Sequence, residues 1–201
     1  MSEQRAVFYY DFNSPYAYLA AERIASVFKQ ADAEQPLWRP ISLAFILRAS
    51  GRTPWSLESE ESRAQGQEEI ARRAAELGLP QVRYPEGWPG GSYSLAPLRA
   101  ATYADQAGRV IAFSLAAFRQ QFAAGRALSD PDNVVLAAAA CELHPKAVLK
   151  AIETESIKQA VRERTEEAIE LGVPGVPTLA VGKELFWGDD RVEEAADAAA
   201  A

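Results

Sequence analysis

The chain has 201 residues, of which 48% are hydrophobic and 24% charged, and its 21 basic and 28 acidic side chains give a formal net charge of −7. This composition is typical of a globular chain and excludes an acidic disordered polymer. No apolar stretch approaches the ~18–20 residues that a membrane helix needs. The negative charge opposes binding to nucleic-acid phosphates, so we expect neither a membrane nor a nucleic acid as partner.

The first residues, MSEQRAVFYYDF, lack the basic and apolar pattern of a secretory signal, so a cytoplasmic location is expected. One cysteine and one histidine cannot form an intramolecular disulfide or a structural zinc site built from those residues, and we expect no metal. Cys141 lies in an alanine-rich segment and is interpreted as a small buried group. His144 precedes a proline and is interpreted as a loop residue; a Ser/His/Asp triad through it is the alternative.

The opening of the chain predicts a β-α-β unit. Residues 6–12 are rich in strand-forming residues and predict a buried strand. Ser14 followed by Pro15 is a typical helix start, and apolar spacing continues the helix to about Lys29. Residues 36–41 form a short extended segment between prolines.

The middle of the chain changes to a helical pattern. Residues 45–47 belong to a helix that ends near Gly51, and the proline- and glycine-rich residues 83–94 predict a loop. Further helices are expected over residues 58–77, 96–107, 111–124, 131–143, 145–152 and 156–171.

Strand signals return near the end. Residues 173–181 and 184–187 predict two strands joined by a turn, and a last helix begins at Val192, with a frayed alanine-rich tail over 195–201. The chain is therefore expected to be an α/β protein with a thioredoxin-like, four-stranded mixed sheet and an inserted all-helical domain. The predicted domains are 1–41 with 172–201, and 42–171.

Two features would meet at one edge of such a sheet. Ser14 lies at a helix N-terminus, where free N–H groups and the helix dipole favour an anion such as a thiolate. The alternative is a simple helix cap worth about 1 kcal/mol. Val176 and Pro177 precede a strand, and a cis bond between them would turn the Val176 backbone toward a ligand; an ordinary trans turn is the alternative.

A third feature lies after the last strand. Asp189 and Asp190 follow each other at a predicted helix start, where one carboxylate would cap the helix and leave the other to bind an ammonium group. Trp187 precedes them and is interpreted either as the wall of a pocket or as a core residue.

These motifs together resemble the 2-hydroxychromene-2-carboxylate isomerases and kappa-class glutathione transferases, in the DsbA-like branch of the thioredoxin superfamily. The resemblance rests on residues 11–19 (DFNSPYAYL), 175–178 (GVPT) and 186–191 (FWGDDR), with matches in type and order over 94–100 and 157–168. It covers essentially the whole chain.

The resemblance implies a thioredoxin domain with a helical domain inserted after its second strand, commonly as a homodimer. It implies glutathione, or another low-molecular-weight thiol, as cofactor, with Ser14 donating a hydrogen bond to the thiolate. Val176, before a cis Pro177, would pair with the cysteinyl part, and Asp190 with the backbone of Asp189 would hold the γ-glutamyl end.

The sequence departs from the family pattern at two positions. Asp189 stands where Asn or Ser is common, and its charge is expected to repel a ligand carboxylate. Arg52 stands where the family usually has Asn, and it is expected either to contact a substrate carboxylate or to be a solvated loop charge. With Tyr16 and Trp187, Arg52 completes the expected substrate-binding residues.

The leading hypothesis is a thiol-dependent isomerase or glutathione transferase that acts on a small conjugated aromatic acid. A disulfide oxidoreductase is a second interpretation, although Ser14 replaces the attacking cysteine of a CxxC motif. A noncatalytic thioredoxin-fold binding module is the third.

Overall fold

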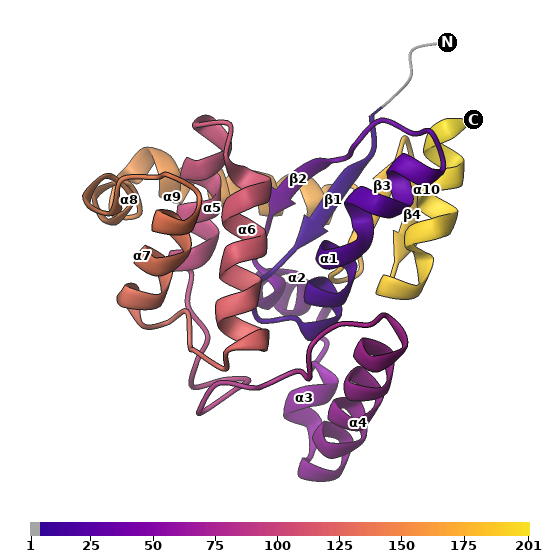
Figure 1. Cartoon of the computed structure of the whole chain (residues 1–201), viewed down its shortest axis with the longest axis horizontal. Helices are drawn as coiled ribbons and strands as arrows, with labels where there is room; N and C mark the ends of the chain where they lie inside the picture. Colours follow the sequence, from indigo (N-terminus) through magenta and orange to yellow (C-terminus); the bar gives the residue numbers. More distant parts are fainter. Residues whose placement is uncertain (1–4) are drawn as a thin grey trace.

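A four-stranded mixed sheet is assembled from the two ends of the chain (Figure 1). The structure, a computed structural model, describes residues 5–201. The strands are β1 (Val7–Tyr10), β2 (Leu37–Pro40), β3 (Thr178–Val181) and β4 (Glu184–Trp187). They lie in the order β2-β1-β3-β4, with β1 parallel to β2 and the β1–β3 and β3–β4 pairs antiparallel. The predicted thioredoxin-like α/β fold is confirmed.

The remaining elements are helical. In chain order they are α1 (Pro15–Gln30), α2 (Leu43–Ser50), α3 (Trp55–Glu58), α4 (Glu60–Glu76), α5 (Ala96–Gln106), α6 (Val110–Phe118), the π-helical turn η1 (Arg119–Ala123), α7 (Pro131–Ala140), α8 (Pro145–Ala151), α9 (Glu155–Glu170), the 3-10 turn η2 (Asp189–Arg191) and α10 (Val192–Ala200).

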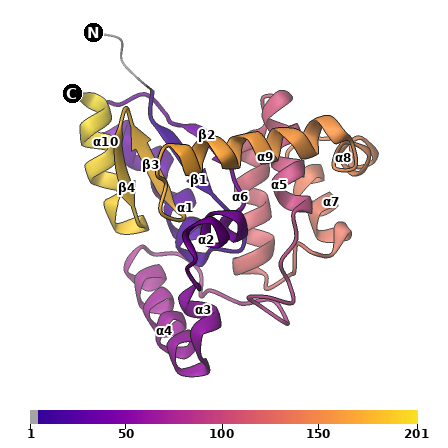
Figure 2. The same ribbon diagram turned by 180° about the vertical axis from the view of Figure 1, so that it is seen from behind.

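The helices surround the sheet unevenly. Helices α1 and α10 lie together over one face, and α9 crosses the opposite face with α2 near it (Figures 1 and 2). Helices α5 to α8 gather beside the β2 edge, while the α3–α4 pair projects from the rest of the molecule. Within this projecting pair, α4 contacts α1.

An aromatic cluster joins the first strand to the helices beside it. Tyr10 is fully buried, and its hydroxyl lies 2.6 Å from the Ser114 Oγ of α6. The ring of Phe118 has centroid distances of 4.9 Å to Phe12, 5.7 Å to Tyr10 and 6.3 Å to Tyr18. Because these rings come from β1, α1 and α6, the sheet and the helical segment share one core.

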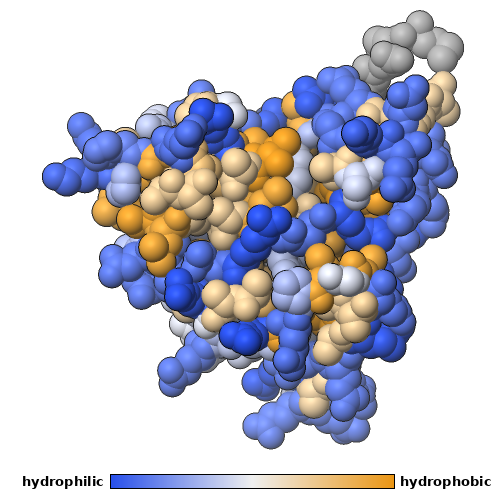
Figure 3. Space-filling view, viewed as in Figure 1, coloured by the Kyte–Doolittle hydropathy of each residue, from blue (hydrophilic) through white to orange (hydrophobic). Residues whose placement is uncertain are grey.

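On the face shown in Figure 3, most of the surface is charged or polar, and apolar side chains gather over α6 and α7. Those helices carry the partly exposed Ile111 and Leu136. Among residues 5–201, no helix combines the length and apolar character needed to cross a membrane.

Three predicted elements differ from the structure. The helix expected over 58–77 is present as α4 but begins at Glu60, because Ser59 is extended and accepts a hydrogen bond from the Ser62 N–H to cap it; the short helix α3 before it was not expected. The strand expected over 173–181 begins only at Thr178, because the segment before it carries Pro177, which has no N–H for a ladder. The prediction of a frayed tail is wrong: α10 runs to Ala200, and Ala195 is fully buried. The domain boundaries at 41/42 and 171/172 stay predictions.

We predict that Phe118→Ala lowers the free energy of unfolding by about 3–5 kcal/mol, since it removes a fully buried ring that contacts three others. Urea denaturation followed by circular dichroism measures this change. Leu136→Ala, on the exposed side of α7, is the control and should change it by less than about 0.5 kcal/mol. A loss below about 1 kcal/mol for Phe118→Ala would contradict the shared core.

Candidate functional site

A cavity of about 1110 Å³ opens between the start of α1, the α2–α4 segment and the loops before β3 and after β4. It is large enough for a drug-sized ligand, for which pockets commonly measure ~300–1,000 Å³. All the predicted site residues line it: Ser14, Tyr16, Arg52, Val176, Pro177, Trp187, Asp189 and Asp190. The sequence-distant motifs therefore meet in one place.

Ser14 is both a helix cap and a cavity residue. Its side chain accepts a hydrogen bond from the Ala17 N–H at 3.2 Å, so the capping interpretation is confirmed. Its hydroxyl also donates to the Val176 carbonyl at a long 3.3 Å, and only 5% of the residue is exposed. Among residues 5–201 the backbone N–H of Tyr16 has no acceptor, so this helix end retains a free donor beside Ser14.

The Val176–Pro177 peptide bond is cis, as the resemblance implied. Both residues line the cavity, and the Val176 carbonyl accepts the hydrogen bond from the Ser14 hydroxyl. The start of α1 and the segment before β3 thus contact each other directly, although 162 positions separate Ser14 from Val176. Pairing of the Val176 backbone with a ligand stays a prediction.

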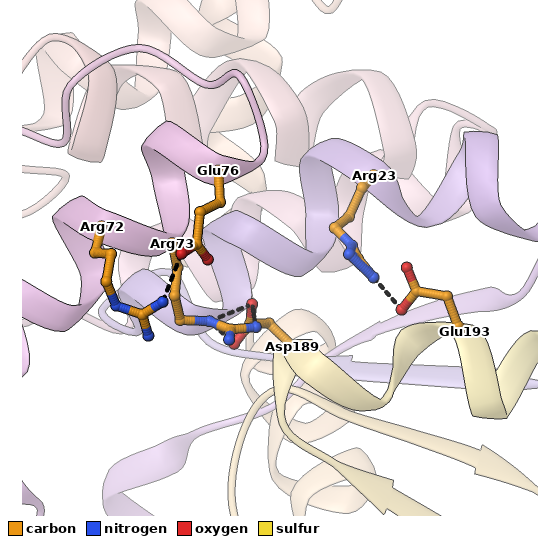
Figure 4. Close-up of polar contacts among 6 residues, drawn as sticks. All are labelled: Arg23, Arg72, Arg73, Glu76, Asp189 and Glu193. Atoms are coloured by element: carbon orange, nitrogen blue, oxygen red, sulfur yellow. Dashed lines mark hydrogen bonds and ion pairs between the residues drawn. The ribbon is translucent and has the colours of Figure 1, made fainter.

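The two consecutive aspartates have different surroundings. Asp189 is buried, and its carboxylate accepts hydrogen bonds from Nε and Nη2 of Arg73 in a bidentate ion pair. The Nη2–Oδ2 distance is 2.5 Å (Figure 4). Asp190 is exposed and has no ion-pair partner within residues 5–201. Burial raises the pKa of the Asp189 carboxyl, and the hydrogen bonds from Arg73 oppose that rise. The interaction with Asp189 raises the pKa of Arg73.

This pairing changes the expectation for Asp189. Its charge was expected to repel a ligand carboxylate, but the Arg73 guanidinium balances it. Asp190 is the carboxylate left without an ion-pair partner, as expected, but the expected cap is wrong: η2 and α10 begin without a side-chain cap, and Asp189 pairs with Arg73 instead. Gly188 before them has φ +122, and a Cβ there would lie 2.2 Å from Asp190 Oδ1, so this turn needs glycine.

Arg52 is exposed but is not an unattached loop charge. Its Nη2 donates to the Pro174 carbonyl at 2.5 Å, and its guanidinium lies 5.2 Å from the centre of the Trp187 ring. Trp187 is 50% exposed and lines the cavity, so it is a wall residue and not a core residue. Contact between Arg52 and a substrate carboxylate stays a prediction.

Aromatic rings form another part of the wall. Tyr16 and Trp55 meet edge to face at 6.1 Å, and Trp55 lies 5.8 Å from Trp88. A Cβ at Gly66 of α4 would lie 2.3 Å from the Trp55 ring, so this glycine allows the ring to rest on the helix. Such rings favour a flat conjugated ligand.

A buried carboxyl supports the site from behind. Asp11, at the end of β1, accepts hydrogen bonds from the N–H groups of Asn13 at 2.9 Å and Leu43 at 2.8 Å, and from the Tyr93 hydroxyl at 3.4 Å. Its partners all line the cavity. Burial raises the pKa of Asp11 to about 6, against which its hydrogen bonds act.

The single cysteine and histidine lie elsewhere. Cys141 is buried at the end of α7 and donates to the carbonyls of Ala137 and Ala138, which confirms it as a packed small group. Burial raises the pKa of its thiol. His144 is exposed before α8 and does not line the cavity, which argues against a triad with Ser14.

Arg73, Trp55 and Trp88 also line the cavity but were not predicted from the sequence as site residues. Arg73 lies in a helix crowded with charges, where nothing distinguishes it from Arg72. The tryptophans carried a weak signal, since each stands beside a proline: Trp88 in the segment expected to be a loop, and Trp55 before the helix expected from residue 58.

The comparisons with known proteins agree with the fold. The model of the DSBA-like thioredoxin domain matches residues 5–200. The 2-hydroxychromene-2-carboxylate isomerase of Sphingobium xenophagum is 25% identical over 187 residues, covering 92% of this chain and 93% of that protein. The enzyme of the same name from Pseudomonas putida is 28% identical over 195 residues, covering 92% and 89%.

Solved structures are similar as well. A 2-hydroxychromene-2-carboxylate isomerase superposes with a TM-score of 0.81 at 25% identity, covering 93% of this chain and 90% of the other. A probable DsbA oxidoreductase from Streptomyces coelicolor has a TM-score of 0.76 at 20% identity, covering 97% and 89%, and supports the fold alone.

We predict that Asp11 makes stability fall as the pH rises. Its pKa is about 6 in the fold against 3.8 ordinarily, so the folded state holds the proton longer and unfolding becomes easier between those values. Relative to Asp11→Asn, the wild type should lose about 2 kcal/mol of unfolding free energy between about pH 4 and pH 7. Urea titrations at each pH measure it.

Asp132→Asn, at an exposed position, is the control and should retain the wild-type dependence. Parallel curves for wild type and Asp11→Asn would show that Asp11 titrates normally.

Proposed function

Because the chain belongs to the DSBA-like thioredoxin domain family, we propose that it is a thiol-dependent isomerase of the 2-hydroxychromene-2-carboxylate type, or a related kappa-class-like glutathione transferase. The observation that carries this proposal is Ser14, whose hydroxyl faces the cis Val176–Pro177 segment in a large cavity. The substrate class would be a small conjugated aromatic acid.

The residues of the cavity fit a low-molecular-weight thiol such as glutathione. Ser14 supplies a hydroxyl whose hydrogen bond to the Val176 carbonyl is long, so it is available to a ligand. The Tyr16 N–H supplies a second donor at a helix N-terminus. Val176 would align the cysteinyl part, and Asp190 would face the ammonium group. When bound, the thiol would supply the sulfur nucleophile that adds reversibly to a conjugated substrate.

Ser14 has the task of keeping that sulfur ionised. A hydrogen bond to a charged group contributes about 1.5–3 kcal/mol, and the dipole of a helix such as α1 adds about 0.3–1 kcal/mol. Because one pKa unit equals about 1.36 kcal/mol, the two together lower a thiol pKa by about one to three units. Redirecting the hydroxyl costs little, since its bond to the Val176 carbonyl is long at 3.3 Å.

The substrate side of the cavity combines rings with positive charge. Tyr16, Trp55 and Trp187 would hold a flat ring, and Arg48 and Arg52, both lining the cavity, would attract its carboxylate. Arg52 would leave the Pro174 carbonyl or share its donors with the substrate. An acidic aromatic ligand is therefore favoured over a neutral one.

The two other hypotheses make different predictions. A disulfide oxidoreductase needs a cysteine at position 14, and the chain's one cysteine is buried at the C-terminal end of α7. Substantial reduction of insulin by the protein would nonetheless favour that activity. A noncatalytic binding module would bind the thiol equally well with Ser14→Ala and show no isomerisation. The homodimer implied by the resemblance is part of the proposal, and sedimentation analysis would test it.

Calorimetric titration with glutathione tests the proposed function. We expect saturable binding at one site per chain at millimolar thiol or below. Absence of binding to glutathione and to other small thiols, with folded protein, would reject the thiol-dependent hypothesis.

We predict that Ser14→Ala slows thiol-dependent isomerisation about 10- to 150-fold, which corresponds to the ~1.5–3 kcal/mol of a charge-assisted hydrogen bond. Steady-state assays with 2-hydroxychromene-2-carboxylate and glutathione measure the rate. Ser59→Ala is the matched control, since it removes a similar cap from α4 outside the cavity lining and should leave the rate unchanged. Equal rates for Ser14→Ala and wild type would reject the role of Ser14.

A further inference from the structure

Arg73 lines the cavity, and some of its guanidinium N–H donors have no acceptor among the described residues. It stands on α4, and its Nε and Nη2 atoms bind the carboxylate of Asp189 on η2 (Figure 4). Its side chain is 20% exposed, and Nη1 has no acceptor among residues 5–201. A guanidinium has five N–H donors in a plane, so Arg73 retains donors for a further acceptor.

Three carboxylates of the cavity lining act on Arg73: those of Glu69, Asp189 and Asp190. Glu69, one helical turn before it, lines the cavity together with Asp189 and Asp190. No salt bridge within the described part of the chain joins Glu69 or Asp190 to a cation. Without Arg73, three carboxylates would face a ligand at this wall, and they would repel any ligand carboxylate.

We infer that Arg73 is a specificity-determining residue that binds a carboxylate of the thiol ligand through its free Nη1 side while it balances the charge of Asp189. The inference rests on the proposed function, because it names the ligand group that the same cavity recognises. Asp190 and Glu69 are then the partners of an ammonium group. The γ-glutamyl end of glutathione, which the resemblance places at Asp189 and Asp190, would then have its carboxylate bound by Arg73 of α4.

A purely structural role for Arg73 predicts a different result. The Arg73–Asp189 pair also ties α4 to η2, so its loss could loosen the wall as a whole. Loosening would weaken every thiol ligand to a similar extent. Recognition of a carboxylate would weaken only the ligands that carry it.

The experiment measures the affinities of two thiols by calorimetry: glutathione, and cysteinylglycine, which lacks the γ-glutamyl group. For Arg73→Gln we expect the preference for glutathione to fall about 10-fold or more, as for loss of a charged hydrogen bond. Adding Asp189→Asn should recover part of that preference, because it removes the carboxylate that Arg73→Gln leaves without its partner. Arg72→Gln is the matched control, because Arg72 pairs with Glu76 on the exposed side of α4. This variant should bind both thiols as the wild type does.

The outcomes separate this inference from the proposed function. If the wild type prefers glutathione and Arg73→Gln keeps that preference, or weakens both thiols equally, the inference is wrong and the proposed function stands. If the folded wild type binds neither thiol, both fail. Should Arg73→Gln not fold, Asp189→Asn alone decides: it frees the Arg73 donors, so the preference should be kept or rise, and its disappearance would overturn the inference.

Discussion

The buried carboxyl of Asp11 fixes the point at which the first strand becomes the candidate site. It accepts N–H groups from Asn13 and from Leu43 at the start of α2, and a hydroxyl from Tyr93 in the long loop. These bonds hold three segments of the cavity wall around the end of β1. No cation pairs with Asp11 within residues 5–201, so ionisation of this buried carboxyl is unfavourable. Its hydrogen bonds nevertheless fix the geometry of the three segments.

Three positions after Asp11, a helix cap places the first candidate site residue. Ser14 ends the extended segment and caps α1, which places its hydroxyl against the Val176 carbonyl before β3. The α3–α4 pair closes the opposite wall through the Trp55 ring and the Arg73–Asp189 ion pair. In the proposed function, Ser14 and Val176 face the sulfur of the thiol and Arg73 of α4 faces its carboxylate. The aromatic side chains contributed by the helices after β2 face the substrate.

Much of this arrangement could be predicted from local sequence. The strand-forming run and the Ser-Pro pair defined β1 and α1, and the family resemblance brought Ser14, Pro177 and Asp190 to one site. The Arg73–Asp189 pair could not be foreseen, because its partners are 116 positions apart and α4 carries many equivalent charges. The helix α3 was missed for another reason: it has only four residues and ends at Ser59, directly before α4 begins.

The central claim is that Ser14 and the start of α1 stabilise a ligand thiolate. The most direct measurement is the pKa of the thiol of bound glutathione, followed by thiolate absorbance across pH in the wild type and in Ser14→Ala. The account predicts a bound thiol pKa about one to three units below that of free glutathione, and a return toward the free value in Ser14→Ala. A bound thiol pKa that equals the free value in the wild type, or that does not change in Ser14→Ala, would contradict it.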